Sequence, residues 1–320
     1  MPPSPDPDLV VVAVPLRDRF RGTTVRESVL VRGAAGWGEF GPFWDYDPAE
    51  CVPWWRAARE AADDGWPPAV RDRVPVNATV PAVGPERAAE IVRASGGCRT
   101  VKVKVAEPGQ SEADDLARVA AVRDALGADG QVRVDANATW DVDTAVARLR
   151  ALDREAGGLE YAEQPCPTVE DLAQVRRRLD VRIAADESVR RAEDPLRVAR
   201  MDAADVLVLK VAPLGGVRAC LDLAERCGLP VVVSSAIDTS VGLAAGVALA
   251  AALPELPFAC GLGTAQMLTA DVADEPLLAV DGALPVRAVV PSAQRLAALA
   301  AHGDVVARWR ARLDAVRALT

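Results

Sequence analysis

From about residue 75 onward, short apolar runs alternate with longer segments in which apolar residues recur at helical spacing. Runs of this length between such segments are typical of buried strands that alternate with helices. The segments 112–127 and 215–228 each end in a glycine, which favours a helix C-cap. The eight runs are 76–80, 100–105, 131–136, 159–165, 181–187, 205–211, 230–236 and 257–263.

Eight strands alternating with seven helices predict the α/β class and, within it, a (β/α)7β TIM-like barrel. A doubly wound open sheet is the alternative, but no GxGxxG motif follows the first run. The first 75 residues differ, because 9–16 and 25–40 have the pattern of an antiparallel meander and 49–64 that of a helix. They therefore predict a small α+β domain.

The predicted domain organisation follows from this change of pattern. Segment 16–24, LRDRFRGTT, has the composition of a mobile cationic loop. We expect an α+β capping domain at 1–75, the barrel at 76–288, and a helical segment at 289–320 that returns to the capping domain.

Composition limits the classes of partner. A net charge of −9 disfavours a nucleic-acid surface, and no apolar run reaches the roughly 18 residues of a membrane span. The N-terminus lacks the basic region of a signal peptide. The six cysteines show no CxxC spacing, which favours reduced thiols over disulfides or zinc ligands. We expect a cytoplasmic protein acting on a small molecule, without nucleic-acid or membrane partners; the oligomeric state is left open.

Lysine usage points to candidate chemistry. The chain has 34 arginines but only three lysines, Lys102, Lys104 and Lys210, and all three lie in apolar runs. Arginine cannot lose its proton near neutral pH, whereas a desolvated lysine can, so lysine suits general-base work. Lys102 and Lys104 alternate with valines, which predicts that both point into the barrel. The single histidine, His302, lies in the C-terminal segment, so His-dependent triads are not expected.

Three successive runs end in carboxylates, at Asp135, Glu163 and Asp186. The carboxyl ends of barrel strands meet at one rim, where active sites lie. Carboxylate oxygens with water and substrate are the ligands that Mg²⁺ accepts, with Mn²⁺ as a substitute. A single acid at a strand end is more often a helix N-cap, but three on consecutive strands favour a metal site.

The lysines and carboxylates together predict a reaction type. A divalent cation on a substrate carboxylate, with a lysine beside the α-carbon, suits proton abstraction to an enediolate. Elimination or reprotonation then completes the reaction. The alternative is that the lysines only neutralise the three acids in an ion network, which costs desolvation and does not explain the avoidance of arginine.

The site candidates belong to five motifs, which follow one another along the chain as Lys102-Val-Lys104, Asp135-Ala-Asn137, Glu163-Gln-Pro165, Asp186-Glu187 and Lys210. These motifs, in this order, resemble the enolase superfamily, muconate-lactonising-enzyme subgroup. Further segments at 15–22, 36–46, 132–140, 234–242 and 261–268 narrow the resemblance. By these segments the chain is similar to the o-succinylbenzoate synthase family of menaquinone biosynthesis, in its actinobacterial form.

The resemblance implies dehydration of 2-succinyl-6-hydroxy-2,4-cyclohexadiene-1-carboxylate to o-succinylbenzoate. Lys104 would remove the α-proton and then protonate the departing hydroxyl on the same face. Lys210 would stabilise the enediolate from the opposite face, and Lys102 would hold the substrate carboxylate and favour the neutral form of Lys104. The loop 16–24 would close over the site and exclude water.

The resemblance also implies a set of substrate contacts. Arg133 shares the inward face with Asp135, and Asn137 belongs to the same motif. Residues after the last two strands would cradle the succinyl tail, although ordinary turn residues are the alternative reading. The candidate substrate-binding residues are Arg133, Asn137, Ser234, Ser235, Thr239, Ser240 and Gly261.

Other functions on this scaffold stay open. N-succinylamino acid racemase activity also needs lysines on both faces, and the motifs do not exclude it. A dipeptide epimerase is disfavoured, because Gly261-Leu-Gly263 replaces the Asp-x-Asp motif usual there. A non-catalytic barrel that binds a metal and an anion is the alternative from another class.

Overall fold

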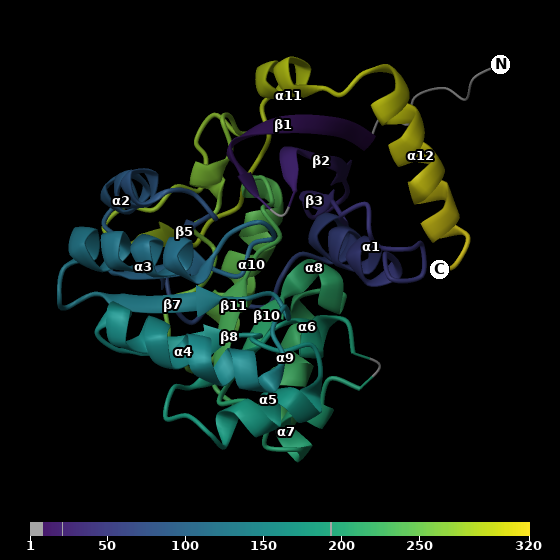
Figure 1. Cartoon of the computed structure of the whole chain (residues 1–320). Helices are drawn as coiled ribbons and strands as arrows, with labels where there is room; N and C mark the ends of the chain where they lie inside the picture. The colour runs from purple at the N-terminus through teal and green to yellow at the C-terminus, as the bar shows by residue number, and fades with distance from the viewer. Residues whose placement is uncertain (1–8, 21, 193) are drawn as a thin grey trace.

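The computed structural model describes residues 9–20, 22–192 and 194–320. Two layers are evident in Figure 1: an antiparallel sheet with its helices above, and a helix-covered parallel sheet below. The upper sheet has the order β1-β2-β3, formed by Leu9–Phe20, Thr23–Arg32 and Trp37–Phe40. The helix α1 (Val52–Arg59) follows and continues into a π-helical turn, η1, at Glu60–Asp64.

The lower sheet contains seven parallel strands in sequence order. Valines and other apolar side chains of these strands face the surrounding helices and form the largest core cluster. The strands are β5 (Ala78–Val80), β6 (Thr100–Lys104), β7 (Gln131–Asp135), β8 (Leu159–Glu163), β9 (Ile183–Ala185), β10 (Val206–Lys210) and β11 (Val231–Ser234). The predicted α/β fold class, with a capping unit before the barrel sheet, is confirmed.

The helices follow the strands as the sequence pattern predicts. Ser111 and Asp114 form a capping box at the start of α3, and Asp141 caps α4. The helices of this part are α2 (Pro85–Arg93), α3 (Glu112–Leu126), α4 (Val142–Ala156), α5 (Val169–Arg176), α6 (Glu187–Arg190), α7 (Arg197–Arg200), α8 (Val211–Leu214), α9 (Val217–Cys227), α10 (Ser240–Ala252) and the 3-10 turn η2 (Ala265–Met267).

The eighth predicted strand, 257–263, is much shorter than expected. It is reduced to isolated parallel bridges from Cys260 to Val76 and from Gly261 to Ser234. These bridges still join the two edges of the sheet, because the Cys260 amide donates to the Pro75 carbonyl and the Gly261 amide to the Val233 carbonyl. A proline and two glycines in this run lower its strand propensity.

Segment 16–24 is not an extended loop. Residues 16–20 belong to β1, and Phe20 pairs with Thr23 at the tip of the β1–β2 hairpin; Arg21 lies outside the described residues. Leu16 bridges Leu268, and the Thr269 amide donates to the Pro15 carbonyl. The strand therefore extends into a segment whose composition alone suggested a loop, although its pairing with β2 is irregular between Pro15 and Phe20.

The C-terminal segment packs on the upper sheet. The strand β12 (Ala283–Pro285) pairs with β4 (Arg73–Pro75), and α11 (Ala293–Leu299) and α12 (Gly303–Arg317) follow. Trp309 of α12 meets Phe40 edge-on, with 5.9 Å between ring centroids. None of the helices in the described ranges combines the length and the apolar character that a bilayer crossing requires.

Candidate active site

Lys102 and Lys104 lie on β6, with their ammonium groups inside the barrel. The Lys102 Nζ donates to both carboxylate oxygens of Glu163, at 2.9 and 2.8 Å. The Lys104 Nζ lies against the Asp135 carboxylate and donates to Asn137 Oδ1 at 2.6 Å. The intervening valines are buried in the core cluster, as strand alternation predicts.

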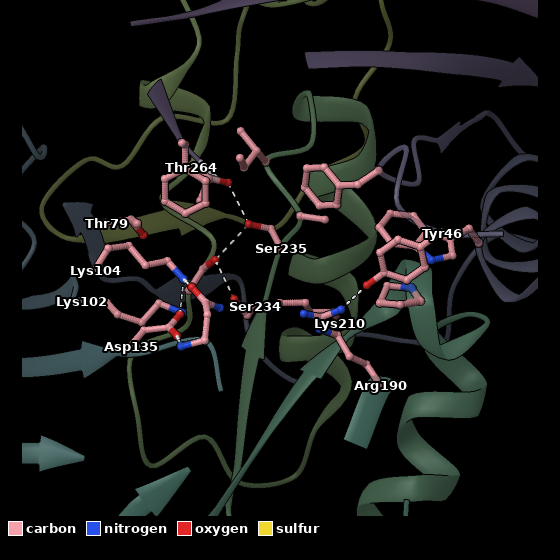
Figure 2. Close-up of a pocket in the computed structure, with 18 residues that line it drawn as sticks. Tyr46, Thr79, Lys102, Lys104, Asp135, Arg190, Lys210, Ser234, Ser235 and Thr264 are labelled. Atoms are coloured by element: carbon pink, nitrogen blue, oxygen red, sulfur yellow. Dashed lines mark hydrogen bonds and ion pairs between the residues drawn. The ribbon is translucent and has the colours of Figure 1, made fainter. Parts of the chain in front are cut away.

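Lys210 ends β10 and faces the lysines of β6. Its Nζ donates to Asp186 Oδ2 at 2.6 Å. In a ring of seven strands closed by an eighth segment, β6 and β10 are separated by three strands on one side and by β11, the closing segment and β5 on the other, so they lie across the barrel from each other. Figure 2 shows Lys102, Lys104 and Asp135 grouped on one side of the pocket and Lys210 on the other.

Asp186, which follows β9, has a second cationic partner. Arg190 of α6 donates through Nε to Asp186 Oδ1 at 2.9 Å and through Nη2 to Glu187 Oε1 at 2.6 Å. Its Nη1 donates to the hydroxyl of Tyr46, a contact that is visible in Figure 2. Because Tyr46 belongs to the segment between β3 and α1, Arg190 links the upper unit to the carboxylates of the barrel.

The site's charges shift one another's pKa. Burial would raise the pKa of Asp135, but Lys104 and Lys102 outweigh it and hold that pKa below its usual range. Burial would likewise raise the pKa of Asp186, but Arg190 and Lys210 keep it low. For Glu163, burial and then repulsion from Asp135 raise the pKa to about 7. Burial lowers the pKa of Lys210 despite its contact with Asp186.

Aromatic side chains of the upper unit cover the pocket. The Phe20 ring lies over the Lys104 ammonium, 5.3 Å from Nζ to the ring centroid. Phe43, Tyr46 and Trp54 also line the pocket. The hairpin tip therefore lies where a closing segment was expected, with an aromatic ring rather than a cation above the base candidate.

The opposite wall comes from the last strands of the barrel. Ser234 and Ser235 follow each other at the end of β11, and the Ser235 hydroxyl donates to the Gly261 carbonyl at 3.0 Å and lies 2.8 Å from Thr264 Oγ1. The predicted site residues that line the pocket are Lys102, Lys104, Asp135, Asn137, Lys210, Ser234, Ser235 and Gly261.

Three of the residues predicted as substrate contacts, Arg133, Thr239 and Ser240, do not line the pocket. Arg133 is completely buried and donates to Asn77 Oδ1 and the Ala259 carbonyl within the barrel. Thr239 and Ser240 are also completely buried, where they bond to Glu39 and Asp271. Each has polar partners within the protein that sequence spacing does not reveal.

Comparison with known proteins places this site in a family. Residues 85–291 match the family described as "Enolase C-terminal domain-like", and 11–62 match "Enolase N-terminal domain-like". The o-succinylbenzoate synthase of Thermobifida fusca is 70% identical over 306 residues, 96% of this chain and 95% of that protein. The o-succinylbenzoate synthase of Mycolicibacterium smegmatis is 58% identical over 97% of this chain and 95% of that protein. The chain belongs to the o-succinylbenzoate synthase family of the enolase superfamily.

Solved structures agree on the fold of this o-succinylbenzoate synthase family member. Muconate lactonizing enzyme from Pseudomonas fluorescens, complexed with muconolactone, has a TM-score of 0.79 at 22% identity and covers 92% of this chain and 98% of its own. The L-Ala-D/L-Glu epimerase from Bacillus subtilis has a TM-score of 0.75 at 25% identity, covering 89% of this chain and 96% of its own.

Members of the enolase superfamily generally use Mg²⁺, so the fit of the carboxylates to a cation matters. Among the described residues, no three or more His, Cys, Asp or Glu side chains form a group that could hold a metal in this arrangement. The oxygens of Asp135, Glu163 and Asp186 face ammonium groups instead. The donor set nevertheless fits a hard cation, because it consists of three carboxylates at the ends of the neighbouring strands β7, β8 and β9.

Sequence reasoning missed several residues of the o-succinylbenzoate synthase pocket. Phe20 and Tyr46 lie in segments that carry the family resemblance, so their position was a usable signal. Arg190 gave no signal, because it is one of 34 arginines. Thr79 lies within β5, and Thr264 lies in the segment 261–268 that carries the family resemblance, so the position of Thr264 was also a usable signal.

Proposed function

We propose that the protein is an o-succinylbenzoate synthase, which dehydrates 2-succinyl-6-hydroxy-2,4-cyclohexadiene-1-carboxylate to o-succinylbenzoate. The observation that carries the proposal is the pair of lysines on opposite sides of the barrel, in a chain 70% identical to a curated o-succinylbenzoate synthase. The substrate is a dianion, and the pocket offers it Lys102, Lys104, Lys210 and Arg190.

Asp135, Glu163 and Asp186 would hold Mg²⁺, or Mn²⁺ in its place. When bound, the cation would supply the positive charge that stabilises the enediolate form of the ring carboxylate. Lys102 would contribute a further positive charge to that carboxylate. Because its ammonium already bridges both oxygens of Glu163, it is fixed in position before substrate arrives.

Lys104 would act as base and then as acid on the same face of the ring. As a free amine it takes the proton from the carbon that bears the carboxylate; as an ammonium it gives a proton to the departing hydroxyl, which leaves as water. Its base form requires that the ion pair with Asp135 opens, while Asn137 continues to orient the amine. The ring of Phe20 above it would exclude bulk water.

Lys210 would act from the opposite face without taking a proton. Held by Asp186, its ammonium would stabilise the negative charge that develops on the ring during proton removal. It would also lie against the face of the ring, where a cation–π contact is favourable.

An ultraviolet assay tests this function. Loss of the diene absorbance of the substrate is followed with the protein and Mg²⁺, and again with EDTA. We expect rapid loss that EDTA abolishes and that added Mg²⁺ restores. If folded protein in the presence of Mg²⁺ gives no loss of diene absorbance, the proposal is wrong.

A further inference from the structure

One wall of the pocket is a short strained segment, residues 235–238, between β11 and α10. Ser235, Ala236 and Ile237 line the pocket. Ile237 has a φ of +60°, a left-handed conformation that is costly for a β-branched residue. Such a conformation persists only where the surroundings enforce it, so the contacts of this segment determine its shape.

Arg26 of β2 reaches from the upper sheet to this segment. Its Nε donates to the carbonyls of Ala236 and Ile237, both at 3.2 Å. Its Nη1 donates to the Glu27 carbonyl at 3.0 Å and its Nη2 to the Gly41 carbonyl, which anchors the guanidinium to its own sheet. The side chain is 3% exposed. A single arginine thus joins two backbone carbonyls of the pocket wall to the sheet above.

Glu39 of β3 fixes the other end of the segment. Its carboxylate accepts from the Thr239 hydroxyl at 2.6 Å, from the Thr239 amide at 3.1 Å and from the Gly242 amide at 2.9 Å. It therefore supplies the acid that the first turn of α10 lacks. Within the segment, Asp238 Oδ2 accepts from the Ala236 amide at 3.0 Å.

The side chains of Arg26 and Glu39 pack closely against two glycines, Gly41 and Gly242. A Cβ on Gly242 would lie 2.8 Å from Glu39 Oε2, and one on Gly41 would lie 2.8 Å from Arg26 Nη2. A side chain at either position would displace the Glu39 carboxylate or the Arg26 guanidinium from its present contacts. The contacts between the upper sheet and the pocket wall therefore depend on the small size of Gly41 and Gly242 as well as on the side chains of Arg26 and Glu39.

We propose that Arg26 and Glu39 are positioning residues, which hold segment 235–238 in the strained shape that binds the non-reacting part of the substrate. The inference rests on the proposed function. Because the segment contributes none of the lysines and none of the three strand-end carboxylates, its loss of shape weakens substrate binding and leaves proton transfer intact. The signature is an increase in KM with kcat preserved.

The chain contains a matched control. Glu60 is also an upper-unit glutamate that caps a barrel helix, because its carboxylate accepts from the amides of Val217 and Arg218 at the start of α9. None of these three residues lines the pocket. Glu60→Ala therefore removes the same kind of capping contact as Glu39→Ala, without touching the pocket wall.

The first experiment compares kcat and KM for dehydration in Glu39→Ala, Arg26→Lys, Glu60→Ala and the unaltered protein. For Glu39→Ala we expect KM to rise about tenfold or more, as expected for the loss of one or more hydrogen bonds, with kcat within about threefold. Arg26→Lys keeps the charge but has three donors on one nitrogen, too few for the four carbonyls that the guanidinium meets, so KM rises again. Glu60→Ala leaves both constants within about threefold.

A second readout does not depend on turnover. Amide hydrogen exchange in residues 236–242 should be faster in Glu39→Ala and Arg26→Lys and unchanged in Glu60→Ala. If the unaltered protein does not dehydrate the substrate, the proposed function fails, and hydrogen exchange alone still tests the positioning role. If Glu39→Ala does not fold, Arg26→Lys carries the test.

Two results would overturn the inference. One is a KM within about threefold of the unaltered value in the folded variants at Glu39 and Arg26. The other is an equal rise in KM for Glu60→Ala, which would mean that general loosening of the contact between the two units is responsible.

Discussion

At the scale of single residues, lysine and arginine occupy different kinds of position in this chain. All three lysines contact the candidate metal ligands, whereas arginines supply the other basic contacts of the described structure. Arg26 and Arg133 are buried and fix backbone carbonyls, a task that suits a guanidinium with five donors. Each of the carboxylates Asp135, Glu163 and Asp186 has a lysine partner. The ion network that the sequence offered as an alternative to catalysis is therefore present.

Lys104→Ala tests whether that network is also catalytic. We expect kcat/KM for dehydration to fall by about 10²–10⁴-fold, the range for loss of a general acid–base residue. Arg99→Ala, which removes a guanidinium that is 76% exposed, is the control and should keep full activity. Dehydration by folded Lys104→Ala at a tenth of the normal rate or more would contradict the assigned role.

Glu39→Gln is predicted to change the pH dependence of stability. Burial, and then repulsion from Asp238, raises the pKa of Glu39 above its ordinary value of 4.5, with Thr239 and Arg26 opposing. A carboxyl with a higher pKa when folded binds its proton more tightly in that state. Its contribution to stability is therefore complete below pH 4.5 and is lost as pH rises through the folded-state pKa.

The side-chain amide of Glu39→Gln cannot ionise. The variant therefore lacks the part of the loss of stability at higher pH that ionisation of Glu39 causes. Urea unfolding at about pH 5 and about pH 8 measures it, and the fall in the free energy of unfolding should be smaller in Glu39→Gln than in the unaltered protein. An equal or steeper fall in the variant would show that Glu39 does not titrate differently in the folded state.

At the scale of elements, the barrel is closed by a connection much shorter than a strand. Cys260 bridges Val76, which precedes β5, Gly261 bridges Ser234 at the end of β11, and Gly263 lies two residues further on. A Cβ on Gly263 would lie 2.5 Å from the carbonyl oxygen of Asn77, which is backbone and cannot turn aside. Close backbone packing at Gly263 thus accompanies the low strand propensity of 257–263, and periodicity alone gives no sign of this packing.

Gly263→Ala should accordingly destabilise the barrel. We expect the free energy of unfolding in urea to fall by about 1–3 kcal/mol through overpacking. Gly84→Ala is the control, because its Cβ would meet its nearest neighbour at 3.8 Å; its cost should stay below about 1 kcal/mol. Equal stability of the two variants would mean that the closure accommodates a methyl group.

At the scale of the whole molecule, the upper sheet has its own apolar cluster, distinct from the barrel core. Trp54, Trp55 and Phe40 pack there with Trp309 and Leu313 of α12. The C-terminal helix thus covers a sheet formed by the first residues of the described chain, as Figure 1 shows. The pocket lies between this unit and the barrel, so both must keep their shape for the site to persist.

Trp309→Ala tests this dependence. The side chain is 1% exposed and its Nε1 donates to Glu27 at 2.8 Å, so truncation leaves a cavity and removes a donor from that carboxylate. We expect a loss of about 3–5 kcal/mol in the free energy of unfolding. Leu319→Ala, at a side chain 56% exposed, should cost less than about 0.5 kcal/mol. A similar small cost at Trp309 would mean that α12 is dispensable.

The sequence by itself determined the barrel and the arrangement of its lysines and strand-end carboxylates. Those features depend on local spacing: alternation along a strand turns Lys102 and Lys104 inward, and parallel strand ends bring Asp135 and Glu163 to one rim. Only the tertiary structure showed the buried contacts of Arg133, Thr239 and Ser240, and the place of Tyr46 beside Arg190. Thr239 and its partner Glu39 are 200 residues apart, and no local pattern encodes a contact made only when separate elements pack together.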